Sequence, residues 1–174
     1  MDGAISTAGG EKLFSDRKAL PLIQDEDEED DYGNRTETET VGLIRCHTGD
    51  AKMTGPNSYG SIGCKYVIHA VGPAYFSYPT IEEPDTLLRS AYQQSLERAR
   101  EVKLEAVAFS LLSAGVFRGS RSRRNVLGIG VESICGFDYR EYPELEEVHM
   151  FAFSPIELNM LLQVVDEMGL TQEL

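Results

Sequence analysis

The sequence contains no tryptophan, and only three cysteines and three histidines among its 174 residues. The cysteines, Cys46, Cys64 and Cys135, are odd in number and far apart, and no Cys-x-x-Cys or Cys/His cluster occurs. This spacing argues against a zinc site and against a disulfide framework. We therefore expect reduced thiols in an intracellular compartment, cytoplasmic or nuclear, and neither a metal nor another cofactor.

Several other signals are missing as well. There is no signal peptide and no apolar run long enough to span a bilayer, so we expect no membrane association. No phosphate-binding GxxxxGK[ST] motif and no GxSxG nucleophile motif occurs. Gly128-Ile-Gly130 lies within a helical pattern and not at a strand-to-helix turn, so it does not indicate a dinucleotide site. Basic residues form no cluster of the kind that nucleic-acid binding requires, which argues against such a partner.

Negative charge is abundant but unevenly placed. Asp25–Asp31 is a run of seven acidic residues, and the stretch through Thr40 adds Glu37 and Glu39 against Arg35. This segment therefore carries −8 of the formal net charge of −13. We expect an acidic, disordered insertion at about 25–40 within a single domain, residues 1–174; the alternative is a specific docking segment.

Apolar periodicity predicts alternating strands and helices. Helical patterns occupy the glycine-rich start to about Leu20, then Pro84–Val102, Val126–Phe137 and a last helix with Ser154 as its N-cap. Its predicted core stripe is Leu158, Leu161, Leu162, Val165 and Met168. Strands are predicted at Ala51–Thr54, Lys65–Val71, Ala106–Leu112 and Glu147–Phe153. The continuous apolar character of Lys65–Val71 predicts burial on both faces.

This alternation indicates a largely parallel sheet with helices on both faces. Ligands of such sheets bind beyond the carboxyl ends of the strands. There the apolar strand Ala106–Leu112 meets Ser113-Ala-Gly115 and, after Gly119, a helix. Backbone amides at a glycine-containing turn of this kind can bind phosphate, because no Cβ blocks a close approach. The alternative interpretation is a turn without a ligand.

Four ordered motifs carry a resemblance to a known family. They are Asp2-Gly-Ala-Ile with Ala8-Gly9, Thr48–Thr54, Lys65–Pro73 and Leu112–Phe117. In this order and spacing the chain resembles a macrodomain over nearly all of its length except the acidic segment. The resemblance implies a three-layer α/β/α fold with a mostly parallel, mixed central sheet. It also implies ADP-ribose or ADP-ribosylated proteins as partners.

The resemblance also assigns roles to individual residues. The loop Ser113, Ala114, Gly115, Val116 and Phe117 would hold the diphosphate, and Gly3, Ala4 and Ile5 would lie on its other side. Phe117 would cover the distal ribose, and Phe153 would stack on adenine. Asp2 matches the carboxylate that hydrolytic members place near the distal ribose, where it could orient or activate water.

Each of these assignments has an alternative. Phe117 and Phe153 could be core aromatics, Asp2 could belong to a frayed terminus, and Arg118 could either pair with phosphate or be solvated. We interpret His69 as a hydrogen-bonded core histidine.

The chain departs from the family pattern at its start. The resemblance implies two strands and a helix before the glycine-rich loop in which this sequence begins, so we expect this chain to lack the amino-terminal strands, as a fragment or as a degenerate member of the family. Their loss would leave an apolar sheet edge uncovered and weaken ligand binding. If the chain is active, the resemblance implies hydrolysis of mono-ADP-ribosyl esters or O-acetyl-ADP-ribose. The alternative is a non-catalytic ADP-ribose reader, or a degenerate scaffold with an incomplete pocket; the oligomeric state stays open.

Overall fold

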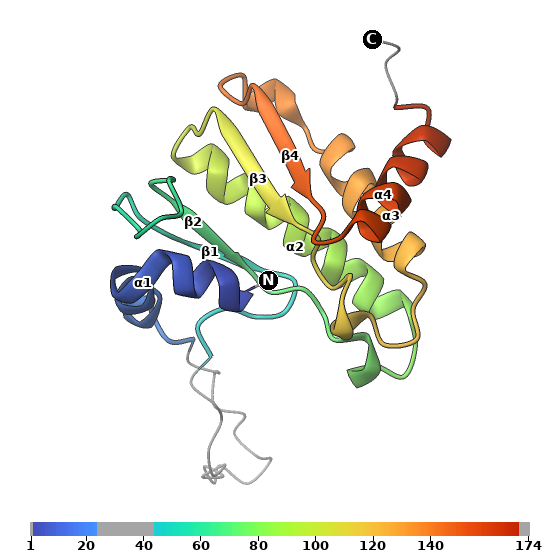
Figure 1. Cartoon of the computed structure of the whole chain (residues 1–174), viewed down its shortest axis with the longest axis horizontal. Coiled ribbons are helices and arrows are strands. Elements are labelled where there is room, and N and C mark those ends of the chain that lie inside the picture. The colour runs from blue at the N-terminus through green and yellow to red at the C-terminus, as the bar shows by residue number, and fades with distance from the viewer. Residues whose placement is uncertain (1, 24–43, 171–174) are drawn as a thin grey trace, which may run out of the picture.

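Helices and strands alternate along the part of the chain that the computed structural model describes, residues 2–23 and 44–170. The acidic segment expected at about 25–40 lies outside these residues, and so does the side chain of Asp2. Figure 1 shows the arrangement. The elements are α1 (Asp2–Ala19), β1 (Ala51–Thr54), β2 (Val67–Ala70), α2 (Glu82–Glu101), β3 (Ala106–Ser110), α3 (Arg123–Cys135), β4 (Glu147–Phe151) and α4 (Pro155–Glu167), with short 3-10 turns η1 (Tyr75–Ser77), η2 (Val116–Arg118) and η3 (Tyr139–Glu141).

The strands form two separate pairs and not one continuous sheet. β1 pairs with β2 antiparallel, Ala51 opposite Ala70, and β3 pairs with β4 parallel, Ala106 opposite Glu147. All four residues of β2 are only half-buried, so the prediction that this strand is buried on both faces is wrong. The reason is the pairing, because among the described residues β2 has a neighbouring strand on one edge only.

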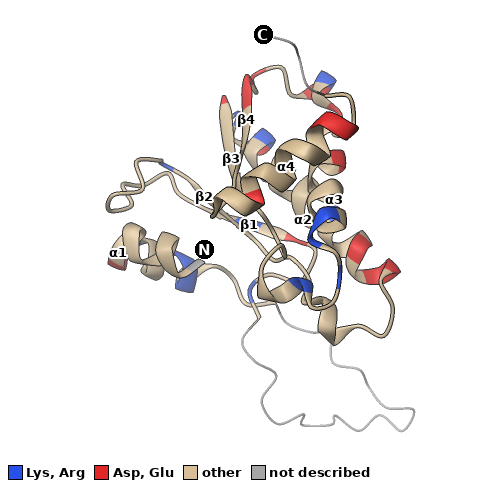
Figure 2. Ribbon diagram, turned by 45° about the vertical axis from the view of Figure 1, so that its right-hand side comes forward, with Lys and Arg blue, Asp and Glu red and all other residues tan. Residues whose placement is uncertain are grey.

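Among the described residues, helices lie on both sides of the β1–β2 pair and on one side of the β3–β4 pair. Figure 2 shows α1 on one side of the β1–β2 pair and α2, α3 and α4 on the other, with acidic and basic residues interspersed over the helices. One hydrophobic cluster joins α2, α3 and α4 to the inner faces of β3 and β4. On the opposite face of the β3–β4 pair, Ala106, Ala108, His149 and Phe151 are exposed. No helix of the described part combines the length and the apolar character needed to cross a membrane.

Helix α2 packs against both strand pairs. The periodicity of Pro84–Val102 predicts an apolar stripe, and the structure confirms it except at Leu87, which is half-buried. The buried members are Leu88, Ala91, Tyr92, Ser95, Leu96 and Ala99. The ring of Tyr92 packs 5.3 Å from that of Phe109 in β3, and its hydroxyl accepts a 3.0 Å hydrogen bond from the backbone of Leu112. A Cβ on Gly130 of α3 would come within 2.9 Å of the same ring. Glycine at 130 therefore allows α3 to pack closely on Tyr92.

The last helix, α4, begins and ends where predicted, but fewer of its apolar residues are buried than predicted. Ser154 is its N-cap, as expected, and its hydroxyl accepts from the backbone of Glu157 at 3.3 Å. The helix ends at Glu167, before Gly169 with φ of 66°. The predicted core stripe is confirmed at Leu161, which is buried, and Val165 packs half-buried against the core. It is wrong at Leu158, Leu162 and Met168, which are exposed. Among the described elements α4 packs mainly against α3, and its apolar residues on the other side face outward.

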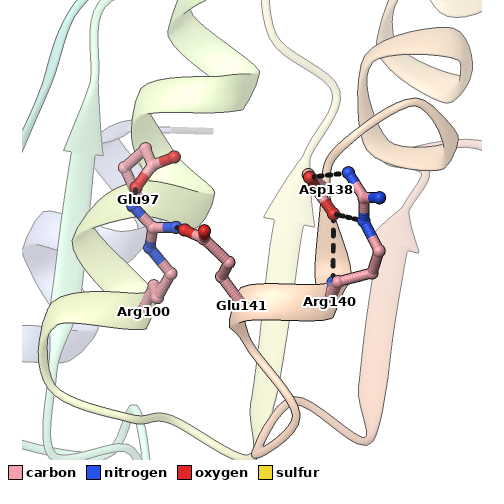
Figure 3. A network of polar contacts seen from close by, with 5 residues as sticks. All are labelled: Glu97, Arg100, Asp138, Arg140 and Glu141. Carbon is pink, nitrogen blue, oxygen red and sulfur yellow. Dashed lines mark hydrogen bonds and ion pairs between the residues drawn. The ribbon is translucent and has the colours of Figure 1, made fainter.

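A network of charged residues fixes η3 near the end of α2 (Figure 3). The Arg100 guanidinium lies between Glu97, at 2.6 Å, and Glu141, at 3.1 Å. Beside it, the carboxylate of Asp138 accepts from the backbone and the side chain of Arg140, and these hydrogen bonds lower its pKa. These groups are exposed in large part, so they contribute little to overall stability.

Helix α1 is attached to the β1–β2 connection through the Asp16 carboxylate and through the Ala8 carbonyl, which accepts from the backbone N–H of Ser61 at 2.9 Å. Asp16 accepts hydrogen bonds from Lys12 at 2.6 Å, from Asn57 at 2.8 Å and from the Tyr59 hydroxyl at 2.9 Å. The hydrogen bond from Lys12, followed by those from Tyr59 and Asn57, holds the pKa of Asp16 below its ordinary value of 3.8. The part of the attachment that Asp16 provides therefore depends on its ionised form.

Acid is expected to release this attachment. Because the pKa of Asp16 is lowered in the folded chain, its stabilising effect is present above pH 3.8 and is lost as pH falls through the lowered pKa. The Tyr59 ring resonances in an NMR titration should report this step below pH 3.8. Asp16→Asn should show the released Tyr59 signals already at neutral pH, and the matched change Asp138→Asn should not. A Tyr59 signal that is unchanged in Asp16→Asn would contradict this role.

Candidate functional site

Three loops meet at the carboxyl ends of the strands, where the sequence predicts the ligand. The loop after β2 and the loop after β3 are joined by a hydrogen bond of 2.7 Å from the Ser113 hydroxyl to the Pro73 carbonyl. A Cβ on Gly72 would lie 2.5 Å from the Ser113 hydroxyl oxygen, so the contact requires glycine there. The backbone of Ser113 is in the left-handed region, with φ of 53°. The chain thus turns sharply at the end of β3.

The turn leaves a row of backbone amides without acceptors in the described part of the chain. No N–H group from Ser113 to Phe117 donates a hydrogen bond to another described residue. Ala114 is buried and anchors the turn, whereas Gly115 is exposed and a Cβ there would meet nothing within 4 Å. The N–H groups of Arg118 and Gly119 are already used, since they donate to Gly115 and Val116. The segment predicted to hold phosphate therefore carries amides that donate to no described residue.

A partly buried ion pair between Arg121 and Asp85 also connects the loop after β2 with the loop after β3. Arg121 donates to both oxygens of Asp85, at 2.6 and 3.3 Å, and the Tyr75 hydroxyl donates to the same carboxylate at 2.7 Å. Burial and this hydrogen bond raise the pKa of Tyr75, so it stays a donor across the physiological range. Asp85 therefore joins η1, the first turn of α2 and the loop that follows η2.

A second connection reaches the third loop. Arg123, at the start of α3, donates to the Ala114 carbonyl at 3.2 Å and lies 4.0 Å from Glu157. The other carboxylate oxygen of Glu157 accepts from the backbone N–H of Phe153 at 3.0 Å. In a capping box, the side chain at this position would accept from the backbone N–H of the N-cap residue, Ser154. Here Glu157 accepts instead from the residue before it, Phe153. Through Arg123 and Glu157, the turn after β3 and the turn after β4 are held in one arrangement.

The predicted aromatic residues both lie on the surface. Phe153 is 80% exposed and Phe117 is 53% exposed, so the alternative of core aromatics is wrong. The Phe117 ring lies 6.4 Å from that of Phe76 in the neighbouring loop, and this pair lies beside the free amides. Both aromatic rings are thus available to a ligand, and their roles in binding stay predictions.

The first predicted binding segment lies in the opening turn of α1. Asp2 is the first residue of the helix, Gly3 and Ala4 are exposed, and Ile5 is half-buried. The Gly3 carbonyl accepts from Thr7 at 2.8 Å, a local contact. The described hydrogen bonds and ring contacts do not connect this turn to the loop after β3, so the structure leaves the two halves of the predicted site unjoined.

Two other candidates have structural contacts of their own. The Arg118 side chain donates to the carbonyls of Gly119 and Arg121, so it braces its own loop. The Nε2 atom of His69 lies 3.0 Å from the Thr54 hydroxyl, which supports the prediction of a hydrogen-bonded histidine, although the residue is half-buried and not in the core.

Sequence reasoning missed the residues that position the loops, Asp85, Arg121, Arg123 and Glu157. The only available signal was that the loop after β3 is followed by several arginines, and no spacing rule links these to acids 36 or 34 positions away. A hollow of about 540 Å³, lined by Pro56–Gly60 and Gly63–Lys65, lies in the β1–β2 connection. It contains none of the predicted site residues.

Comparisons with known proteins agree on one family. A family model described as Macro domain matches residues 1–123. A macro domain-containing protein of Vibrio parahaemolyticus is 36% identical over 117 residues, which are 67% of this chain and 55% of that protein. Another, from Caldanaerobacter subterraneus, is 31% identical over 168 residues, 97% of this chain and 80% of that protein. The chain thus spans little more than half of the Vibrio relative.

Some of the similar curated proteins have names that state an activity. The O-acetyl-ADP-ribose deacetylase 1 of Pantoea vagans is 27% identical over 166 residues, 95% of this chain and 81% of that protein. Among solved structures, a variant of the Oceanobacillus iheyensis macrodomain described as solved with ADPR superposes with a TM-score of 0.71 at 21% identity. This match covers 97% of this chain and 77% of that one. It establishes the shared fold and confirms the α/β class expected from the sequence.

Proposed function

The chain belongs to the macrodomain family, and from this premise we propose that it binds ADP-ribose, free or attached to a protein, at the carboxyl edge of its strands. The observation that carries the proposal is the row of unpaired amides from Ser113 to Phe117, with Gly115 open to solvent. Such amides favour an anion, and a diphosphate offers several acceptor oxygens to them at once. The solved relative with ADPR and the relative named as an O-acetyl-ADP-ribose deacetylase support the same ligand class.

The ligand would extend from the amides in two directions. Phe117, beside Phe76, would cover the distal ribose, and the exposed ring of Phe153 would stack on adenine. Gly3, Ala4 and Ile5 would lie on the other side of the diphosphate, which requires the first turn of α1 to approach the loop when the ligand binds. We therefore infer that binding orders the two halves of the site together.

Calorimetric titration with ADP-ribose, with AMP as the control, tests this function. We expect a dissociation constant on the order of micromolar for ADP-ribose, about −8 kcal/mol, and much weaker binding of AMP, which lacks the second phosphate and the distal ribose. Equal binding of the two ligands would show that the diphosphate cradle is not used. Absence of binding to either would contradict the proposal for this chain.

We further propose that the chain hydrolyses mono-ADP-ribosyl esters or O-acetyl-ADP-ribose, with Asp2 as the group that orients and activates water. Asp2→Ala is then expected to lower turnover by roughly 100-fold or more, because a positioned general base typically contributes that much. Its affinity for ADP-ribose should stay within about threefold, or 0.6 kcal/mol. Glu11→Ala removes another carboxylate from α1, at an exposed position, and should change neither quantity.

The competing function is a non-catalytic reader of ADP-ribosylated proteins. It is favoured by the separation of α1 from the loop after β3, because a catalytic carboxylate must lie within hydrogen-bond reach of the attacking water. A chain that binds ADP-ribose but turns over no ester, with or without Asp2, would be a reader. Turnover that persists in Asp2→Ala would remove Asp2 from the mechanism.

A further inference from the structure

An exposed aromatic pair lies at one end of the proposed phosphate loop. It consists of Phe76, from η1, and Phe117, from η2, whose ring centroids lie 6.4 Å apart. Phe76 is 64% exposed and Phe117 is 53% exposed, so each side chain keeps more than half of its surface open. Covering aromatic surface of this extent is favourable, and aromatic side chains dominate the energetics of many binding sites. The role proposed for Phe117, covering the distal ribose, leaves Phe76 unexplained.

The backbone around Phe76 is held in place from two sides. Tyr75, the preceding residue, is buried and donates its hydroxyl to Asp85 at 2.7 Å. On the side of η2, Gly119 has φ of 53°, and a Cβ there would lie 3.4 Å from the Phe76 backbone nitrogen. The buried ring of Tyr75 therefore anchors η1, and the close approach of Gly119 sets its distance from η2. The backbone positions of the aromatic pair are thus fixed before a ligand binds.

The two segments that carry the pair contain no charged residue. Residues 72–81, around Phe76, include none, and neither do residues 111–117. The next residue along the chain, Arg118, directs its guanidinium to backbone carbonyls of its own loop. A group bound against Phe76 would therefore meet aromatic carbon and uncharged backbone from these segments. Such surroundings favour an apolar group and disfavour a charged one, because a charge loses its hydration there without gaining a partner.

The orientation proposed for ADP-ribose brings the acyl group of its esters to this pair. The diphosphate would lie on the free amides, and Phe117, the last residue of that row, would cover the distal ribose. In O-acyl-ADP-ribose a hydroxyl of this same ribose carries the acyl group. An acyl chain would therefore extend from beneath Phe117 toward the neighbouring ring of Phe76. An acetyl group ends close to the ribose, whereas a hexanoyl chain is long enough to lie along both rings.

From this geometry we propose that Phe76 determines specificity, and that it selects ADP-ribose esters whose acyl chain is apolar and longer than acetyl. This selection rests on the proposed function, from which it takes the orientation of the ligand. It concerns binding, and it applies whether or not the ester is hydrolysed. Each methylene group that contacts the rings adds apolar burial, so the affinity should rise by roughly two- to fourfold for each one.

Calorimetric titration of the whole chain with non-hydrolysable analogues tests the proposal. In these analogues an acylamino group replaces the ester on the distal ribose, so the readout does not depend on turnover. We expect the hexanoylamino analogue to bind at least about tenfold more tightly than the acetylamino analogue. The succinylamino analogue, whose chain ends in a carboxylate, should bind no more tightly than the acetylamino analogue, because its charge would lie against the aromatic rings.

Variants at Phe76 show whether this residue causes the preference. Phe76→Ala should reduce the ratio of hexanoylamino to acetylamino affinity to about threefold or less, and Phe76→Leu, which keeps an apolar side chain, should retain a larger share of it. Phe14→Ala is the matched control, since Phe14 is 50% exposed on α1 and takes no part in the proposed site. This control should leave the ratio unchanged. The thermal midpoint should change little in these variants, because both side chains lie largely outside the core.

Four outcomes would overturn the proposal. Equal affinities of the hexanoylamino and acetylamino analogues, in a chain that binds unmodified ADP-ribose, would refute the selection and leave the proposed function intact. A preference that persists in Phe76→Ala would assign it to other residues. Tighter binding of the succinylamino analogue would assign this position to a charged group, such as an acidic peptide. Absence of binding of ADP-ribose and of every analogue would contradict the proposed function, and the selection with it.

Discussion

Replacing Gly115 by valine is expected to weaken ADP-ribose binding by at least about 100-fold, or 2.7 kcal/mol, while the chain stays folded. Gly115 lies in the middle of the free amides, and a Cβ added there meets no atom of the protein within 4 Å. The valine side chain would therefore occupy the space of the diphosphate and not that of the core. Calorimetric titration gives the affinity, and the thermal midpoint reports the fold.

Gly128→Val is the matched control for this experiment. Gly128 also has nothing within 4 Å of an added Cβ, but it lies in α3 and not in the loop. This variant should keep its affinity and, because glycine is a poor helix residue, should be no less stable. Equal affinities of Gly115→Val and the unmodified chain would mean that the loop after β3 is not the phosphate site.

Replacing Asp85 by alanine is expected to lower the free energy of unfolding by roughly 2–3 kcal/mol, somewhat less than the loss of a partner in a fully buried pair. Asp85 and Arg121 are only 20% and 18% exposed, and the carboxylate holds the Tyr75 hydroxyl as well. The change leaves a guanidinium and a hydroxyl partly buried without their acceptor. In a domain of this length the thermal midpoint should fall by about 5–10 °C.

The same variant should also bind ADP-ribose more weakly, because Asp85 joins the loop after β2 to the loop after β3. Asp85→Asn keeps an acceptor for Tyr75 without the charge and should give an intermediate result in both measurements. Arg89→Ala is the control for loss of an ion pair, since Arg89 and Glu132 are 45% and 48% exposed. That pair should contribute less than about 1 kcal/mol. A loss as small in Asp85→Ala would contradict the role assigned to it.

The helices could be predicted because their signals are local. Periodicity along Pro84–Val102 identified the buried stripe of α2, and Ser154 and Gly169 marked the limits of α4. Burial in α4 could not be predicted in the same way. Periodicity indicates an apolar face but not whether another element covers that face. Leu158 and Leu162 therefore follow the helical period and are nevertheless exposed.

In the candidate site, too, one part could be predicted from the sequence and another could not. The turn Ser113–Phe117 could be found from an apolar strand followed by a small glycine-containing segment, and the structure supplies the free amides. The side chains that hold it, Asp85 and Arg123, come from two different helices. Contacts between residues so far apart in the chain depend on how the helices pack, and no local pattern records them.

The sequence by itself determined the family, the kind and order of the elements, and the loop on which ligand binding is proposed to depend, because each of these rests on residue types at short, fixed spacings. Only the tertiary structure decided how the strands combine. It pairs β1 with β2 and β3 with β4, leaves β2 and β3 unpaired beside each other, and separates α1 from the loop after β3. The physical reason is that a strand needs backbone partners from elsewhere in the chain, so its burial and its free edge depend on neighbours that its own sequence does not name.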